Sequence, residues 1–402
     1  MKTIGAVGFG SALVSADAIA EPNNPNTQEK ILKPKLPMRK LGKTGIEVPC
    51  FSLGTIFDVA GKQIVLRKAL QLGVTFWDTA HDYAGGNSEL GIGKFLERSP
   101  EVRKDLFLVS KASRARTVAE VEERLVLSLE RMKTDYIDLY YAPHGASDPA
   151  QFTDELKQWA ESAKKQKLIR FFGFSTHSNM AQCLTAAAKL GWIDALMTSY
   201  NFRLMQDPQM QAAIDACHKA NIGIIAMKTT GKTTISRFRL ALETAADKKL
   251  IEHLLQRGFA QEQATIKLVL GDERISCACV GMESVAVLTA NVAAVLDKTE
   301  LTQTDREIFK QYAEATCSGY CAGCVDICNA ALADLPYVSD IMRYLMYYNS
   351  YGERHAAREL FAQIPDKVRY KLLDIDYSLV EARCPQHLPI GELIAEAVSK
   401  LA

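Results

Sequence analysis

The stretch LFLVSKASRARTVAEVEERLVLSLERMKTDYIDLYYA, residues 106–142, contains the pattern that decides the fold. The apolar runs 106–110 and 137–142 are typical of strands buried on both faces, and 118–131 has the spacing of an amphipathic helix. Strands of this kind, each followed by such a helix, indicate a parallel sheet whose outer face is covered by helices.

The same strand-and-helix unit recurs on both sides of this stretch, and eight such units follow one another. Eight units within about 250 residues favour a closed TIM (β/α)8 barrel. An open doubly wound sheet stays an alternative, although its usual Gly-x-Gly-x-x-Gly signature is missing after the early strands. The expected strands are 48–53, 74–78, 106–110, 137–142, 168–174, 195–199, 222–227 and 277–280; the expected helices are 63–72, 88–97, 118–131, 151–165, 180–190, 208–220, 261–270 and 284–296.

The N-terminal segment 1–20 resembles a cleavable export signal. Ile4–Ala16 is small and apolar, and Ala18-Ile19-Ala20 fits a small-residue cleavage site. Lys2-Thr3-Ile4-Gly5-Ala6 is similar to the interior of a twin-arginine signal, but the two arginines are absent. The segment is too short for a permanent membrane span. We therefore expect a periplasmic or exported protein, or a cytoplasmic one if the signal does not function.

Composition sets the remaining domain plan. The 402 residues are 48% apolar and 24% charged with a net charge of +1, which gives no electrostatic basis for binding nucleic acid. Residues 21–36 are rich in Pro, Asn and Lys and are predicted to be a linker. Residues 37–302 form the predicted barrel. Residues 303–402 form a small all-α extension, with helical patterns at 304–316, 339–346 and 354–363, and carry five of the ten cysteines.

Four polar residues lie near the carboxyl ends of three successive predicted strands, where a barrel of this kind has its active site. They are Asp78, Tyr83, Lys111 and His144. Reducing a carbonyl requires a proton for the developing alkoxide, and a nearby ammonium lowers the pKa of a tyrosine. Lys111 can supply that ammonium, Asp78 can hold it, and His144 can donate a hydrogen bond to the carbonyl oxygen. None of these groups accepts a hydride, so a cofactor must carry it.

Several motifs in the correct order resemble the aldo-keto reductase family. They cover residues 39–300 and are FWDTAHDYAGGNSE (76–89), LVSK (108–111), SLERMKTDYIDL (128–139), His144 and GFS (173–175). The resemblance implies that Tyr83 is the general acid, that Lys111 and Asp78 set its pKa, and that His144 orients the substrate. It also implies a nicotinamide cofactor, NADPH or NADH, bound across the barrel mouth by Ser175, Lys228, Gly281, Ser284 and Asn291.

Several of the positions expected to contact the cofactor depart from the family pattern. Thr176 replaces an asparagine, Met197 a glutamine, Met227 a tyrosine and Ala290 an acidic residue. Glu283 places a carboxylate near the expected adenosine phosphate, which it would repel. Lys228, Lys232 or Arg274 can compensate. The resemblance therefore supports the proton chemistry more firmly than a particular hydride donor.

The cysteines of the extension, together with Met227-Lys228, resemble a subgroup fused to a ferredoxin-like domain. Cys317, Cys321, Cys324 and Cys328 are spaced C-x3-C-x2-C-x3-C, and Cys384-Pro385 follows later. One 4Fe–4S cluster is the implied ligand, while zinc, disulfides or free thiols stay open. Cys50, Cys183, Cys217, Cys277 and Cys279 are expected in the core. His177, His218 and His253 are expected at the surface.

Three functions remain in competition. The first is nicotinamide-dependent reduction of an aldehyde or ketone, or the reverse oxidation. A redox partner protein that binds the barrel is also compatible with this function. The second is a lyase that uses Lys111 as a Schiff base. The third is a non-catalytic nicotinamide-binding redox sensor or partner subunit, which the changes at Met197 and Met227 keep open.

Overall fold

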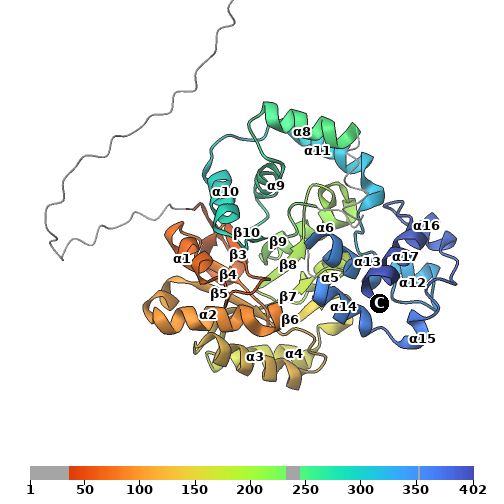
Figure 1. Cartoon of the computed structure of the whole chain (residues 1–402). Coiled ribbons are helices and arrows are strands. Elements are labelled where there is room, and N and C mark those ends of the chain that lie inside the picture. The colour runs from red at the N-terminus through yellow and green to blue at the C-terminus, as the bar shows by residue number, and fades with distance from the viewer. Residues whose placement is uncertain (1–35, 232–244, 352–353) are drawn as a thin grey trace, which may run out of the picture. The chain divides into compact units, whose positions relative to one another are not determined.

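The computed structural model describes residues 36–231, 245–351 and 354–402. In these ranges parallel strands close into a barrel in the order β10-β3-β4-β5-β6-β7-β8-β9, as Figure 1 shows. This closed barrel confirms the TIM fold and excludes the open sheet. The strands are β3 (Phe51–Gly54), β4 (Phe76–Asp78), β5 (Phe107–Lys111), β6 (Ile137–Ala146), β7 (Ile169–Thr176), β8 (Ala195–Ser199), β9 (Gly223–Met227) and β10 (Cys277–Gly281).

The first expected strand is in fact divided between two elements. An antiparallel hairpin of β1 (Met38–Lys40) and β2 (Glu47–Pro49) precedes β3. Proline lacks an N–H for a strand ladder, and Pro49 is the last residue of β2. Leu41 and Val48 of the hairpin pack into the same cluster as residues of the barrel interior.

Helices follow the strands and surround the barrel (Figure 1). A capping box opens α3: Thr117 Oγ1 accepts from the N–H of Glu120, and the Glu120 carboxylate accepts from the N–H of Thr117. The sequence did not predict α8, which lies in the long connection after β9. The helices are α1 (Gln63–Gln71), α2 (Asn87–Arg98), α3 (Val118–Met132), α4 (Asp154–Lys165), α5 (Met180–Ala187), α6 (Pro208–Lys219), α8 (Ala245–Gln256), α9 (Gln261–Leu270) and α10 (Val285–Leu296).

The barrel interior is filled by side chains, so it is a core and not a channel. Its buried residues include Phe76, Val109, Leu139, Met197 and Cys277. The five cysteines expected in the core are all buried. Because the interior is closed by apolar packing, the polar side chains that end the strands are confined to the mouth of the barrel.

The extension is helical, as predicted, and has a hydrophobic core of its own that includes Ile341, Phe361 and Ile394. Its first helix, α11, also packs on the barrel: the rings of Phe309 and Tyr312 lie 5.4 Å and 5.7 Å from that of Phe202. The division at 302/303 stays a prediction. The helices are α11 (Gln303–Ala315), α12 (Val325–Ala331), α13 (Val338–Met346), α14 (Arg354–Ala362), α15 (Asp366–Arg369), α16 (Ser378–Arg383) and α17 (Ile390–Leu401).

Candidate active site

The ends of neighbouring parallel strands bring the predicted acid–base residues together. Asp78 ends β4, Lys111 ends β5, and His144 lies in β6 opposite Ser175 of β7. The pairing of β6 with β7 is irregular on both sides of His144. Irregularities of this kind re-aim side chains next to active sites. The imidazole therefore owes its position to the bend of β6 as well as to the strand itself.

Lys111 and Asp78 form a buried ion pair. Lys111 Nζ lies 2.6 Å from Asp78 Oδ1 and donates to the Thr79 carbonyl oxygen at 2.6 Å. The two side chains are only 1% and 3% exposed. Burial raises the pKa of Asp78, and the Lys111 ammonium opposes that rise. Removing either partner would leave the other charge buried without compensation.

Tyr83 stands beside this ion pair. The Lys111 ammonium lies 4.9 Å from the centre of the tyrosine ring, and the rings of Tyr83 and His144 meet edge to face at 6.2 Å. Tyr83 opens a 3-10 turn that continues to Gly86. Gly86 has φ +94, and a Cβ there would lie 3.0 Å from the Arg131 guanidinium, so the turn requires glycine at this position.

Arg131 holds the loop that carries Tyr83 through contacts with His81 and Glu89. Arg131 Nη1 donates to the His81 carbonyl oxygen at 2.8 Å and lies 3.3 Å from Glu89 Oε2. The carboxylate of Glu89 is fully buried and also accepts from Ser110 Oγ at 2.7 Å. This network connects the start of α2, the end of β5 and the end of α3, and so it positions the tyrosine turn.

His144 is held as a neutral imidazole. Burial, followed by the charge of Lys111, lowers the pKa of His144 to about 4. Its Nδ1 lies 3.0 Å from Ser113 Oγ. In the tautomer in which Ser113 donates to Nδ1, Nε2 carries the proton and can donate to a substrate oxygen.

Near the position predicted for the nicotinamide, several side chains have partners within the barrel. Ser175 is fully buried, and its Oγ accepts from the N–H of Gly145 at 3.1 Å. The Thr176 hydroxyl donates to the carbonyl oxygens of Ala146 and Ser178. Met197 is 2% exposed within the barrel core. The Thr176 hydroxyl and the Met197 side chain are therefore engaged in hydrogen bonds and packing within the barrel.

The segment predicted to hold the adenosine end lies at β10 and α10. Ser284 caps α10, with its Oγ accepting from the N–H of Val287 at 3.3 Å, and Gly281 ends β10. Asn291 is buried within α10. A helix N-terminus of this kind offers N–H donors to a phosphate.

The acidic residue beside that segment has a partner that the sequence did not predict. Glu283 forms an exposed ion pair with Lys62, whose Nζ lies 2.7 Å from Glu283 Oε2. Arg274 is instead engaged by Asp215 and Asp272, and Lys232 lies outside the described residues. That Lys228 or Arg274 compensates for the repulsion between Glu283 and a cofactor phosphate stays a prediction.

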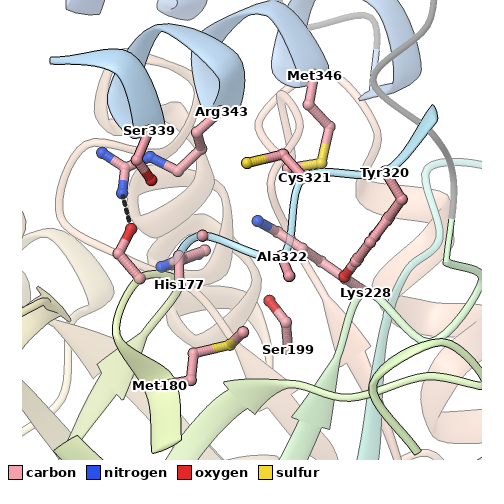
Figure 2. Close-up of a pocket in the computed structure, with 12 residues that line it drawn as sticks. His177, Met180, Ser199, Lys228, Tyr320, Cys321, Ala322, Ser339, Arg343 and Met346 are labelled. Atoms are coloured by element: carbon pink, nitrogen blue, oxygen red, sulfur yellow. Dashed lines mark hydrogen bonds between the residues drawn. The ribbon is translucent and has the colours of Figure 1, made fainter. Parts of the chain in front are cut away.

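A pocket beside the catalytic group contains residues of both the barrel and the extension. Figure 2 shows Lys228, at the end of β9, and His177, after β7, facing Arg343 of α13 across it. The expectation that His177 lies at the surface is met only in part: it is partly exposed, lines this pocket, and its ring is 6.2 Å from that of His144. No local pattern could indicate this position, because several of the residues that line the pocket with His177 belong to the distant extension.

Four cysteines of the extension lie near one another. Burial raises the pKa of Cys321, Cys324 and Cys328, and neighbouring thiols, that of Cys384 among them, raise it further. Cys317 lies near Arg203. All five are free thiols, which argues against disulfides. In the described ranges no three His, Cys, Asp or Glu side chains gather closely enough to hold a metal ion.

The fold and this arrangement define the class of the protein: a TIM-barrel protein with a group of titratable side chains at the carboxyl ends of its strands. Comparison with known sequences gives the family. Residues 55–314 match the model of the Aldo/keto reductase family, and the chain belongs to it. Membership makes the chain, in general terms, a nicotinamide-dependent oxidoreductase.

Individual relatives are distant. The chain is 24% identical over 291 residues to L-galactose dehydrogenase of Arabidopsis thaliana, covering 66% of this chain and 90% of the relative. It is 25% identical to L-glyceraldehyde 3-phosphate reductase of Escherichia coli O157:H7, with 67% and 92% covered. A solved aldo-keto reductase from Bacillus halodurans, in its holo form, has a TM-score of 0.59 at 24% identity, with 70% and 97% covered. This last similarity supports the barrel fold.

Two expectations concern segments or properties that the structure does not test. The export-like segment 1–20 and the linker to residue 35 lie outside the described residues. Among the helices that are described, none combines the length and the apolar character needed to cross a bilayer.

Proposed function

We propose that the protein reduces an aldehyde or ketone to an alcohol, or catalyses the reverse oxidation, with Tyr83 as the general acid or base. The observation that carries this proposal is the buried Lys111–Asp78 ion pair, with its ammonium 4.9 Å from the Tyr83 ring. A nearby ammonium favours the ionised form of a tyrosine, so it makes the phenol a better proton donor to an alkoxide.

In this mechanism each residue has one task. His144 Nε2 and the Tyr83 hydroxyl orient the substrate oxygen, and Tyr83 delivers the proton as negative charge develops on that oxygen. Asp78 keeps Lys111 charged and in place. Bound nicotinamide supplies or accepts the hydride. Ser175, Gly281, Ser284 and Asn291 are the residues that would hold it, with NADPH preferred over NADH.

Replacing Tyr83 tests the proposal. Tyr83→Phe removes the proton donor and is expected to lower kcat/KM for a neutral aldehyde about 10²- to 10⁴-fold, the usual contribution of general acid catalysis. The assay is NADPH oxidation at 340 nm, and NADPH affinity is measured by fluorescence titration. The matched control is Tyr370→Phe, since Tyr370 is 81% exposed in the extension.

Different results would favour the other functions. Wild-type protein that binds NADPH but reduces no aldehyde or ketone would support the sensor or partner-subunit function. Absence of binding of both NADPH and NADH would contradict the oxidoreductase proposal altogether. The Schiff-base function is disfavoured because Lys111 is held as an ammonium by Asp78 and by the Thr79 carbonyl oxygen. Borohydride trapping of a carbonyl compound on Lys111 would support the Schiff-base function.

We also propose that the extension binds one 4Fe–4S cluster and that the protein is exported. The mutual proximity of Cys321, Cys324, Cys328 and Cys384 supports the cluster. Cys317 stays a predicted ligand and lies near Arg203.

Iron and labile sulfide are measured in full-length protein purified without oxygen. About four of each per chain are expected, falling by half or more in Cys324→Ser and staying unchanged in Cys217→Ser, whose thiol is buried in the barrel. Protein without iron after anaerobic reconstitution would contradict the cluster. Export is tested by fractionating bacterial cells that express the chain with its first 20 residues.

A further inference from the structure

We propose that the pocket shared by Lys228, Arg343 and His177 binds an anionic group, a carboxylate or phosphate, carried by the carbonyl substrate. This inference rests on the proposed function and specifies its substrate class. It depends on contacts between the barrel and the extension, which the arrangement in Figure 2 makes visible.

The pocket carries positive charge. Its described lining residues include the cations Lys228 and Arg343 and the neutral His177, and none of these described lining residues is acidic. The hydroxyls of Ser178, Ser199 and Ser339 add further hydrogen-bonding groups. A partly buried group of cations and donors of this kind favours an anion, because charge attraction is stronger where water is excluded.

Contacts with Ser178 and Asp340 orient the Arg343 guanidinium. Its Nη1 donates to Ser178 Oγ at 3.2 Å, and its Nη2 lies 2.8 Å from Asp340 Oδ1. Asp340 offsets part of the charge but also fixes the guanidinium at the pocket. A guanidinium has five N–H donors in a planar fork that matches a carboxylate or a phosphate. The two bonds therefore orient Arg343 for a ligand and do not use up its donors.

Lys228 has an uncommon backbone conformation. It has φ +55, in the left-handed region that residues other than glycine seldom adopt. Its carbonyl oxygen accepts from Asn201 Nδ2 and from the N–H of Gly231, which holds the backbone in that conformation. Its ammonium lies 5.3 Å from the ring of Tyr347 in the extension. The strained backbone thus directs the side chain from the end of β9 toward α13.

His177 of the pocket lies close to His144 and Tyr83 of the proposed reacting centre. The rings of His177 and His144 are 6.2 Å apart, and those of His144 and Tyr83 are also 6.2 Å apart. Burial lowers the pKa of His177 well below its usual range, and Lys228 and Arg343 lower it further. A short carbonyl compound can therefore place its oxygen at Tyr83 and His144 and its anionic group in the pocket.

Equilibrium binding tests the pocket without requiring turnover. Butyrate and inorganic phosphate are titrated by calorimetry into full-length protein purified without oxygen. Binding is expected for at least one probe, with affinity about 10- to 100-fold weaker in Arg343→Met and in Lys228→Met. Lys367→Met, which removes a charge from an exposed site elsewhere in the extension, should change it less than 2-fold.

A substrate pair then identifies the source of the anion. The ratio of kcat/KM for 4-oxobutanoate to that for butanal should exceed 10 in wild type and fall about 10- to 100-fold in Arg343→Met. Butyrate should compete with butanal and bind the NADPH complex. Competition with NADPH instead would assign the cations to a cofactor phosphate and overturn the proposal.

Absence of binding by both probes would also overturn the proposal. Reduction of neutral butanal with NADPH is measured on the same preparation. Its presence or absence tests the carbonyl reductase function separately from the anion pocket.

Discussion

Three imidazoles near the barrel mouth are kept neutral by their surroundings. Burial is the main cause in each case; it lowers the pKa of His144 to about 4 and that of His81 to about 4, and it lowers the pKa of His177 well below its usual range. Cations reinforce the effect, Lys111 at His144 and Arg131 at His81. At neutral pH the site therefore contains hydrogen-bonding imidazoles and not imidazolium ions.

This arrangement predicts a specific dependence of stability on pH. In the unfolded chain an imidazole has its usual pKa of 6.5 and takes up a proton before the folded one, whose pKa is about 4. The unfolded state thus binds more protons in this window, and the stabilising contribution is lost as the pH falls from about 6.5 to about 4.

His144→Gln should remove its share of that loss. Urea denaturation at pH 7 and pH 5 is expected to show the variant gaining about 1–2 kcal/mol relative to wild type at the lower pH, after allowance for partial exposure. His355→Gln is the matched control, because the His355 side chain is 89% exposed. An equal pH dependence in wild type and His144→Gln would contradict the buried neutral imidazole.

At the level of elements, strand and helix positions follow from local pattern, whereas their ends and irregularities do not. Hydrophobic runs and amphipathic spacing located each barrel strand and the helix after it, because both are set by neighbours in sequence. The bend of β6 around His144 and the glycine-dependent turn after Tyr83 depend on packing against β7 and on Arg131.

Two of the helices that the sequence did not predict, α8 and α17, pack on partners that are distant in the sequence. α8 packs against α11 through Leu250, Leu254 and Phe309. α17 covers the core of the extension with Leu393 and Ile394. Neither has an apolar face that pairs with an adjacent strand, so periodicity alone does not reveal where it belongs.

In the molecule as a whole, Arg203 joins the barrel to the extension. It is 7% exposed, donates to the carbonyl oxygens of Gly231 and Thr316, each at 3.1 Å, and lies over the rings of Phe202, Tyr312 and Tyr320 at 4.9–5.5 Å. Burial lowers its pKa. The buried cation is therefore stabilised by carbonyl oxygens and aromatic faces from both parts.

Arg203→Met should weaken this junction. The variant removes the bonds from Arg203 to the Gly231 and Thr316 carbonyl oxygens and its packing on three aromatic rings, and it is expected to lower the free energy of unfolding by about 2–4 kcal/mol. Urea denaturation followed by circular dichroism measures the loss. Arg358→Met is the control, because that exposed arginine makes one bond within the extension, to the Lys400 carbonyl oxygen, and should change stability by less than about 0.5 kcal/mol. Similar stabilities for the two variants would show that Arg203 does not hold the parts together.

The sequence by itself determined the barrel and the types of residue at its mouth. Asp78, Lys111 and His144 fall at strand ends, and the ends of parallel strands meet at one face whatever the details of packing. Tyr83 follows one of those strands within a few residues, so local order was sufficient to place it in the same group.

Only the tertiary structure decided which residues line the pocket between the barrel and the extension. Arg343 donates to Ser178, which lies 165 residues away in the sequence, and the Lys228 ammonium lies over the ring of Tyr347 of the extension. The proximity of Cys321, Cys324 and Cys328 to Cys384 likewise depends on how the extension folds. Contacts between distant segments are fixed by packing of the whole chain, and no local pattern encodes them.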